Sequence, residues 1–193
     1  MATTTLERLK GFRNFGYFRT VTDTEEAYTA SDRKQLDGAF SCSKTDDKTT
    51  TPIPADDNAM WDVENDWEST TLTVVVRQML LADLAKLSGG KMETGAGDDL
   101  GMIEGIYDEA PTVALNFAAL QKGEKYRCFT YFCAQLTKAE VNHQTTGGDT
   151  KTQDYTLEFK CKGRKIDGAM RLVKVLPDYD AAKLHLETIA AAP

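Results

Sequence analysis

Residues 110–136, APTVALNFAALQKGEKYRCFTYFCAQL, constrain the fold most, because they form two apolar runs joined by the polar sequence QKGE. This pattern predicts a β hairpin whose turn lies at residues 121–124. Side chains alternate between the two faces of a strand, so Val113, Leu115 and Phe117 share one face of the first strand. In the second strand both faces carry bulky side chains. One face has Tyr126 and Phe132, and the other has Phe129 and Tyr131.

A strand that is apolar on both faces must be covered on both. Two interpretations fit the pattern. The second strand is either a central strand of an ordinary β sandwich, or a strand whose second face meets another subunit.

The rest of the chain predicts a mainly β protein, an antiparallel sandwich or open barrel with one or two short helices. Period-two patterns and β-branched runs predict strands at 15–21, 36–43, 61–65, 68–78, 102–107, 155–161 and 169–176. A helical period predicts a helix at 79–87, which Ser88-Gly89-Gly90 ends, and Pro177-Asp178 opens a C-terminal helix. Residues 24–33 are expected to form a loop or short helix, and 44–57 and 138–154 long loops. Residues 95–99 read as a turn.

Length and composition indicate one globular domain spanning 1–193. The chain is 41% hydrophobic and carries 23 basic against 30 acidic residues, a net charge of −7. A negative net charge argues against a basic surface that binds the nucleic acid backbone. The N-terminus lacks a signal-peptide pattern and no window is long and apolar enough for a membrane span, so we expect a cytoplasmic protein without a membrane partner. The four cysteines lack a CxxC pair and are expected to be reduced and structural.

Catalytic motifs are missing from the sequence, so no enzyme, cofactor or metal site is predicted. The only histidines are His143 and His185, and no GxSxG, P-loop or GxGxxG motif occurs. Acidic residues cluster around Trp61 and Trp67, which leaves a carbohydrate-binding or hydrolytic β sandwich as an alternative of another class.

A family resemblance rests on the hairpin and extends along most of the chain. The hairpin has the form AP-x-VALxFxAL-x-KG-x-KYR, and it is followed by a polar loop, by the strand at 155–161 and by a K-G-x-x-x-D-G turn at 162–168. A strand and helix at 70–87 lie in the expected place. This pattern resembles the major tail protein, or tail tube protein, of long noncontractile-tailed phages and related prophage particles.

The resemblance implies a structural protein of the virion tail. Its subunits would form stacked, hexameric rings around a hollow tube, and assembly would take place in the cytoplasm of the host bacterium. The implied partners are further copies of the chain, a tape-measure protein, tail terminator and distal tail proteins, and DNA that passes without specific binding. A tube subunit of a phage-tail-like bacteriocin or of a secretion apparatus is the alternative within the same class.

By the same analogy, three groups of residues are predicted to mediate assembly. The loop at 44–58 would reach the next ring, and the arm at 1–12 and the segment at 178–193 would make secondary contacts. Acidic side chains would line the lumen and repel phosphates over roughly 8 Å at physiological salt. The loop residues are Lys44, Asp46, Asp47, Lys48, Asp56 and Asp57; the lumen candidates are Asp62, Glu64, Asp66, Glu68 and Glu158; the arm contacts are Leu6, Leu9, Phe12, Leu184 and Leu186.

Overall fold

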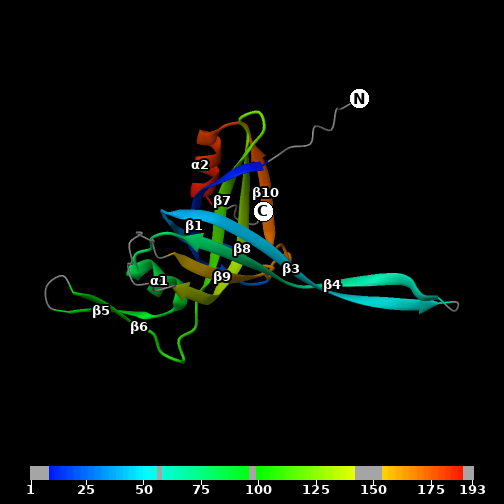
Figure 1. The fold of residues 1–193 in the computed structure, drawn as a ribbon, viewed down its shortest axis with the longest axis horizontal. Helices are drawn as coiled ribbons and strands as arrows, with labels where there is room; N and C mark the ends of the chain where they lie inside the picture. Colours follow the sequence, from blue (N-terminus) through cyan, green and yellow to red (C-terminus); the bar gives the residue numbers. More distant parts are fainter. Residues whose placement is uncertain (1–8, 56–57, 96–98, 142–153, 189–193) are drawn as a thin grey trace, which may run out of the picture.

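The computed structural model describes residues 9–55, 58–95, 99–141 and 154–188, and it is mainly β, as predicted. Ten strands and two helices occur in this part of the chain (Figure 1). The strands are β1 (Leu9–Asp23), β2 (Tyr28–Gln35), β3 (Ala39–Ala55), β4 (Asn58–Val76), β5 (Lys91–Thr94), β6 (Leu100–Ile103), β7 (Thr112–Gln121), β8 (Tyr126–Val141), β9 (Tyr155–Lys162) and β10 (Arg171–Leu176). The helices are α1 (Leu81–Ser88) and α2 (Tyr179–Glu187).

Eight of the strands form one antiparallel sheet in the order β2-β1-β7-β8-β9-β4-β3. The eighth strand, β10, pairs with the first half of β8, from Tyr126 to Tyr131, whereas β9 pairs with the second half, from Cys133 to Val141. The sheet curls so that side chains of β1 and β7 face those of β4 and β9 across a shared apolar core. The architecture is therefore a sandwich or open barrel made from a single sheet.

The predicted hairpin is confirmed as β7 and β8. Val113 pairs with Ala134 and Leu120 with Tyr126, and the turn between the strands contains Gly123 at a φ of 85°. A positive φ is readily adopted by glycine because it has no Cβ. Val113, Leu115, Phe117 and Tyr131 all enter the main core, as the alternation predicted.

The second face of β8 is covered by the chain itself, and not by another subunit. Tyr126 and Cys128 pack against Ala182 and Leu186 of α2, while Phe132 packs against Tyr28 of β2. All of these side chains are buried. The interpretation that this face meets a second subunit is therefore wrong, and the sandwich interpretation is correct.

The predicted helix at 79–87 is confirmed as α1, which covers one end of the core with Leu87. Its Asp83 accepts a hydrogen bond of 3.1 Å from the Tyr17 hydroxyl of β1, and both side chains are buried. The helix ends at Gly89, where φ is 86° and an added Cβ would lie 2.3 Å from the Glu109 carbonyl oxygen. No other residue fits this position without displacing backbone.

Four predictions of local structure are corrected. Residues 24–33 contribute to strand β2, and residues 44–55 belong to β3, not to a loop. The arm predicted at 1–12 is the start of β1 from Leu9 onward. The strand predicted at 102–107 ends with β6 at Ile103, so residues 104–107 lie outside it. In addition, residues 138–141, expected to begin the second loop, belong to β8. Residues 1–8 and 142–153 lie outside the described part.

Candidate assembly surfaces

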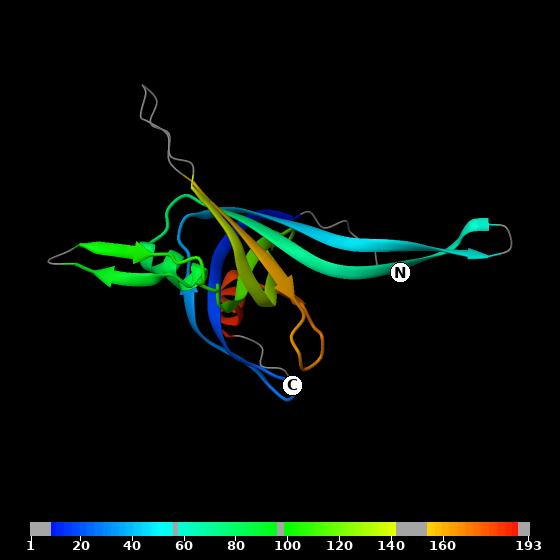
Figure 2. The same ribbon diagram turned by 90° about the horizontal axis from the view of Figure 1, so that it is seen from below.

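The most prominent feature of the surface is a long β hairpin that leaves the body of the molecule (Figures 1 and 2). β4 pairs with β9 only from Thr70 to Val76, but it pairs with β3 along its whole length. From Ser69 toward the tip of the hairpin, β4 pairs with β3 alone among the described strands. We call this part of the hairpin, residues 46–69, the arm. A two-stranded hairpin is at best marginally stable in water on its own. The arm therefore depends on its attachment to the body and on whatever it contacts.

The base of the arm is held by side-chain hydrogen bonds between its two strands. Thr70 donates to Asp46 at 2.5 Å and Ser69 donates to Asp47 at 3.0 Å, while Lys44 also pairs with Asp46. The hydrogen bonds from Lys44 and Thr70 lower the pKa of Asp46. Three residues predicted to contact the next ring, Lys44, Asp46 and Asp47, thus have partners within the chain. Of the other three, Lys48 is exposed in β3, and Asp56 and Asp57 lie outside the described residues.

One face of the arm is acidic. Asp62, Glu64 and Asp66 alternate along β4, and they pair across the hairpin with Ile53, Thr51 and Thr49. Directly opposed residues point to the same side, so these carboxylates share a face. Glu68, at the bulge between Trp67 and Ser69, accepts a hydrogen bond from the Thr49 hydroxyl and extends the acidic row.

The fifth lumen candidate lies elsewhere. Glu158 is in β9 on the body, where it pairs with Thr73 of β4 and with Lys138 of β8. Lys138 forms an ion pair of 2.6 Å with Glu140, which raises the pKa of Lys138. The five predicted lumen residues therefore belong to two different surfaces, a mixed-charge face of the body and an acidic face of the arm.

The contacts predicted for the N-terminal segment at 1–12 and the C-terminal segment at 178–193 also divide into two kinds. Phe12 packs against Phe117 with ring centroids 5.0 Å apart and ring planes tilted by 56°, and Leu186 of α2 is buried against β8. These two belong to the chain's own core. Leu9 and Leu184 are exposed and remain available for contact, and Leu6 lies outside the described residues.

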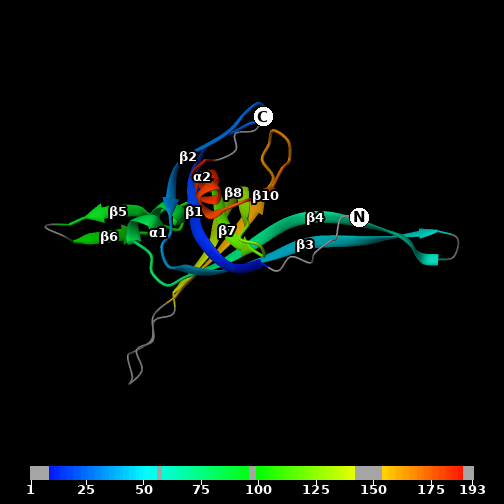
Figure 3. The ribbon, with the colours of Figure 1, turned by 90° about the horizontal axis from the view of Figure 1, so that it is seen from above.

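A second protrusion lies on the opposite side of the body from the arm (Figures 1 and 3). It consists of the β5–β6 hairpin and the turn that follows, in which the Asp108 N–H donates to the Gly105 carbonyl at 3.0 Å. The two central residues of this turn, Ile106 and Tyr107, are 91% and 90% exposed. Two adjacent large apolar side chains at such exposure make this turn a candidate contact surface. The sequence pattern hid this feature because these residues read as the end of a strand.

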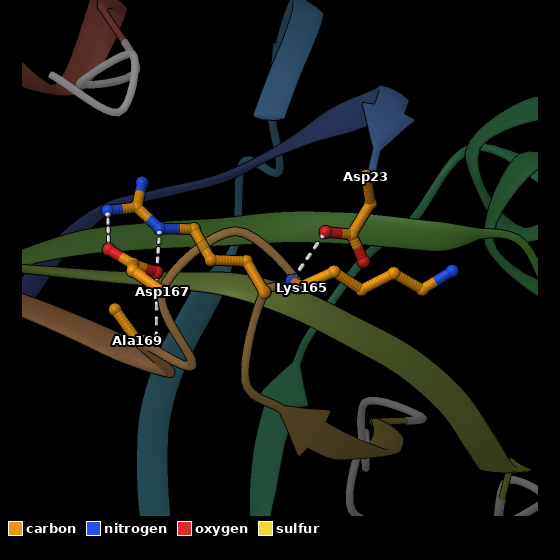
Figure 4. A network of polar contacts seen from close by, with 5 residues as sticks. Asp23, Lys165, Asp167 and Ala169 are labelled. Carbon is orange, nitrogen blue, oxygen red and sulfur yellow. Dashed lines mark hydrogen bonds and ion pairs between the residues drawn. The ribbon is translucent and has the colours of Figure 1, made fainter. Parts of the chain in front are cut away.

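The turn between β9 and β10 closes over the second face of β8. Arg164 is buried with its guanidinium 4.1 Å from the centroid of the Phe132 ring, and it donates to Asp167 from Nε at 2.8 Å and Nη2 at 2.7 Å. Asp167 also accepts from the Ala169 N–H at 3.0 Å, and Asp23 of β1 accepts from the Lys165 N–H at 2.9 Å (Figure 4). The hydrogen bonds from Arg164 and from the Ala169 N–H lower the pKa of Asp167 to about 2. The sequence pattern predicted the turn at these residues but carried no signal for a buried arginine.

In the described part of the chain, no group of three or more His, Cys, Asp or Glu side chains could hold a metal ion. Cys128, Cys133 and Cys161 are buried, and burial raises the pKa of each thiol. Burial also lowers the pKa of His185, while His143 lies outside the described residues. The Trp67 indole donates to Thr70 at 3.3 Å at the base of the arm, and the side chain of Trp61 is outside the described part.

Neither of the two described helices is long and apolar enough to cross a membrane. No protein-family model and no curated protein sequence matches the chain.

Proposed function

We propose that this chain is a structural tail tube subunit, which assembles into stacked, hexameric rings and thereby forms a hollow tube for the passage of DNA. It acts through its surfaces and catalyses no reaction. The same assembly would serve a phage-tail-like bacteriocin or a secretion apparatus, and the neighbouring genes distinguish these from a phage tail.

The observation that carries this proposal is the arm. It extends two paired strands away from the core, and its described side chains from Lys48 to Ile53 are all exposed. A monomer gains nothing in stability from ordering such a segment, because the ordering costs conformational entropy that little burial offsets. Contact with another copy would supply the missing burial.

Two further features support assembly of identical copies. The arm and the apolar Ile106–Tyr107 turn lie on opposite sides of the body, and contacts between unlike surfaces of identical subunits generate rings or open-ended stacks. In addition, β2 and β3 are the two ends of the sheet order, so each presents a row of backbone groups without a neighbouring described strand. Such edges can pair with a neighbouring copy.

The other partners and the location follow from this role. A tape-measure protein would occupy the lumen during assembly, and terminator and distal tail proteins would cap the two ends. The subunit would assemble in the host cytoplasm and remain in the virion. A net charge of −7 favours DNA that slides past without binding.

Electron microscopy of the purified chain tests the proposal. We expect hollow tubes or rings of constant width after the protein is concentrated. The matched variant replaces residues 49–66 by an Asn-Gly turn that joins Lys48 to Trp67, which pair in the native hairpin. Because pairing with β9 begins at Thr70, this variant should keep the melting temperature of the native chain but form no tubes.

A native chain that stays a monodisperse monomer at every concentration, and also when seeded with preformed tail tips, would contradict the proposed function. Tubes formed equally well by the shortened variant would show that the arm is dispensable, and the supporting argument would fail.

A further inference from the structure

The body carries a basic groove that the sequence did not reveal. The groove encloses about 510 Å³ between the end of β1, the start of β7, the middle of β8 and the end of β9. Arg19, Lys160, Lys162 and Lys165 line it, against one carboxylate, Asp23. All four cationic side chains are exposed. Figure 4 shows the Lys165 side chain extending past Asp23.

Charge is distributed very unevenly along this acidic chain. Residues 44–69, which include the arm, contain eight carboxylates and two lysines, and residues 91–109, the second protrusion, contain six carboxylates and one lysine. The remainder carries 20 basic and 16 acidic residues and is therefore net positive. The protrusions and the body thus have opposite charge, and opposite charges steer surfaces together and fix their register.

We propose that the groove receives the acidic face of the arm from a second copy of this chain. The spacing of the charges supports this pairing. Lys160 and Lys162 are two residues apart on β9, as Glu64 and Asp66 are on β4, and the rise of a strand separates such residues by ~6.6 Å. Two carboxylates on an extended strand can therefore meet two ammonium groups on another strand in one register.

The arm fits the groove better than the second protrusion does. The arm presents its carboxylates in a regular row along one face of a strand. The second protrusion also carries the exposed apolar side chains of Ile106 and Tyr107, which would have no apolar partner among the cationic residues of the groove. The arm also projects away from its own body (Figure 2), which leaves it accessible to another molecule.

This inference rests on the proposed function for the identity of the second copy, but its test does not require tubes. Unlabelled and ¹⁵N-labelled full-length chains are mixed and treated with a carbodiimide, which joins a carboxylate directly to an amine only where the two touch. Mass spectrometry then identifies joined peptides that combine both isotopes. We expect Glu64 or Asp66 of one copy to be linked to Lys160 or Lys162 of the other.

Charge reversal provides the specific control. Lys160→Glu with Lys162→Glu should lower the yield of mixed-isotope links roughly tenfold or more, because like charges then face each other. Mixing this double variant with a Glu64→Lys, Asp66→Lys chain should restore links of reversed chemistry, from an arm lysine to a groove carboxylate. The matched control, Lys122→Glu with Lys125→Glu, changes the same charge in the exposed β7–β8 turn and should leave the yield unchanged.

The outcomes separate this inference from the proposed function. Tubes without arm-to-groove links would overturn the inference and leave the function standing. Links in small oligomers that never form tubes would support the inference and contradict the function. Links confined to single copies would overturn the inference. Binding of a short fluorescent duplex DNA supplies a further test. The inference would be overturned if the native chain binds this DNA tightly and the Lys160→Glu, Lys162→Glu variant loses the DNA but keeps its arm links, because the groove would then be a nucleic-acid site.

Discussion

At the residue scale, a single buried cation organises the turn that closes over β8. Arg164 lies above the Phe132 ring, and its charge is balanced by the carboxylate of Asp167, whose side chain is exposed. Two hydrogen bonds between planar groups make this pair stronger than a single-contact ion pair. The arginine can therefore be buried against aromatic rings without an unbalanced charge.

The pKa of Asp167 predicts how this contact responds to acid. The folded state holds this pKa at about 2, below the usual value of roughly 3.9 for an aspartate. A lowered folded pKa stabilises the protein above the unfolded pKa, and the stabilisation is lost as pH falls toward the folded pKa. We expect Asp167→Asn to be less stable than the native chain at pH 7, and this difference to shrink between pH about 4 and about 2.

Denaturant unfolding over that pH range measures the effect. Other carboxylates titrate in the same window, so the relevant quantity is the difference between the variant and the native chain. Glu104→Gln, at an exposed position, supplies the control and should follow the native curve. A constant difference between Asp167→Asn and the native chain at every pH would refute the linkage.

At the element scale, α2 covers the second face of β8. Asp178 caps the helix by accepting from the Ala181 N–H at 2.8 Å, and the buried Asn116 of β7 donates to the Leu186 carbonyl at 2.6 Å. The cap stabilises the first turn of the helix, and α2 docks on the sheet through the Asn116 hydrogen bond near its end and through the buried Ala182 and Leu186. Cys128 lies directly under this contact and is 1% exposed.

Two leucines of α2 provide a matched pair of substitutions. Leu186→Ala removes a buried side chain and should lower the free energy of unfolding by about 2–5 kcal/mol. It should also speed alkylation of Cys128, because undocking of α2 exposes that thiol. Leu184→Ala alters a side chain that is 66% exposed and should change stability by less than about 0.5 kcal/mol. Equal effects of the two substitutions would contradict the docking described for α2.

At the scale of the whole molecule, the opposite charges of protrusions and body predict that assembly weakens with salt. The Debye length falls from about 10 Å at 0.1 M to about 3 Å at 1 M, so exposed charges attract each other over shorter distances. We expect sedimentation to show less assembled material as sodium chloride rises from about 0.1 M to about 1 M. Apolar contacts would respond in the opposite direction in strongly excluded salts such as sulfate.

Assembly that increases with sodium chloride would show that contacts such as those of Ile106 and Tyr107 dominate over charge pairing. The melting temperature of the isolated subunit provides the control, since it should change little over the same range of salt. In the charge-reversed Lys160→Glu, Lys162→Glu chain, added salt should no longer weaken assembly, because it then screens a repulsion and not an attraction.

The sequence by itself determined the elements whose signals are local. Alternation predicted β7, β8 and β9 and the faces of their side chains, and the helical period with Gly89 predicted α1. Asp178 marked the start of α2 in the same way. These predictions succeeded because each pattern is complete within a short segment, where periodicity alone decides which side chains are buried.

Tertiary structure decided the features that depend on distant segments. Residues 44–55, with two prolines, read as a loop, but they pair with β4, and proline is tolerated there because β3 is an edge strand. The cover on the second face of β8 comes from α2 and from the turn after β9. The basic groove unites Arg19 with Lys160 and Lys162, residues more than a hundred positions apart that no local pattern connects, because only the pairing order of the sheet brings them together.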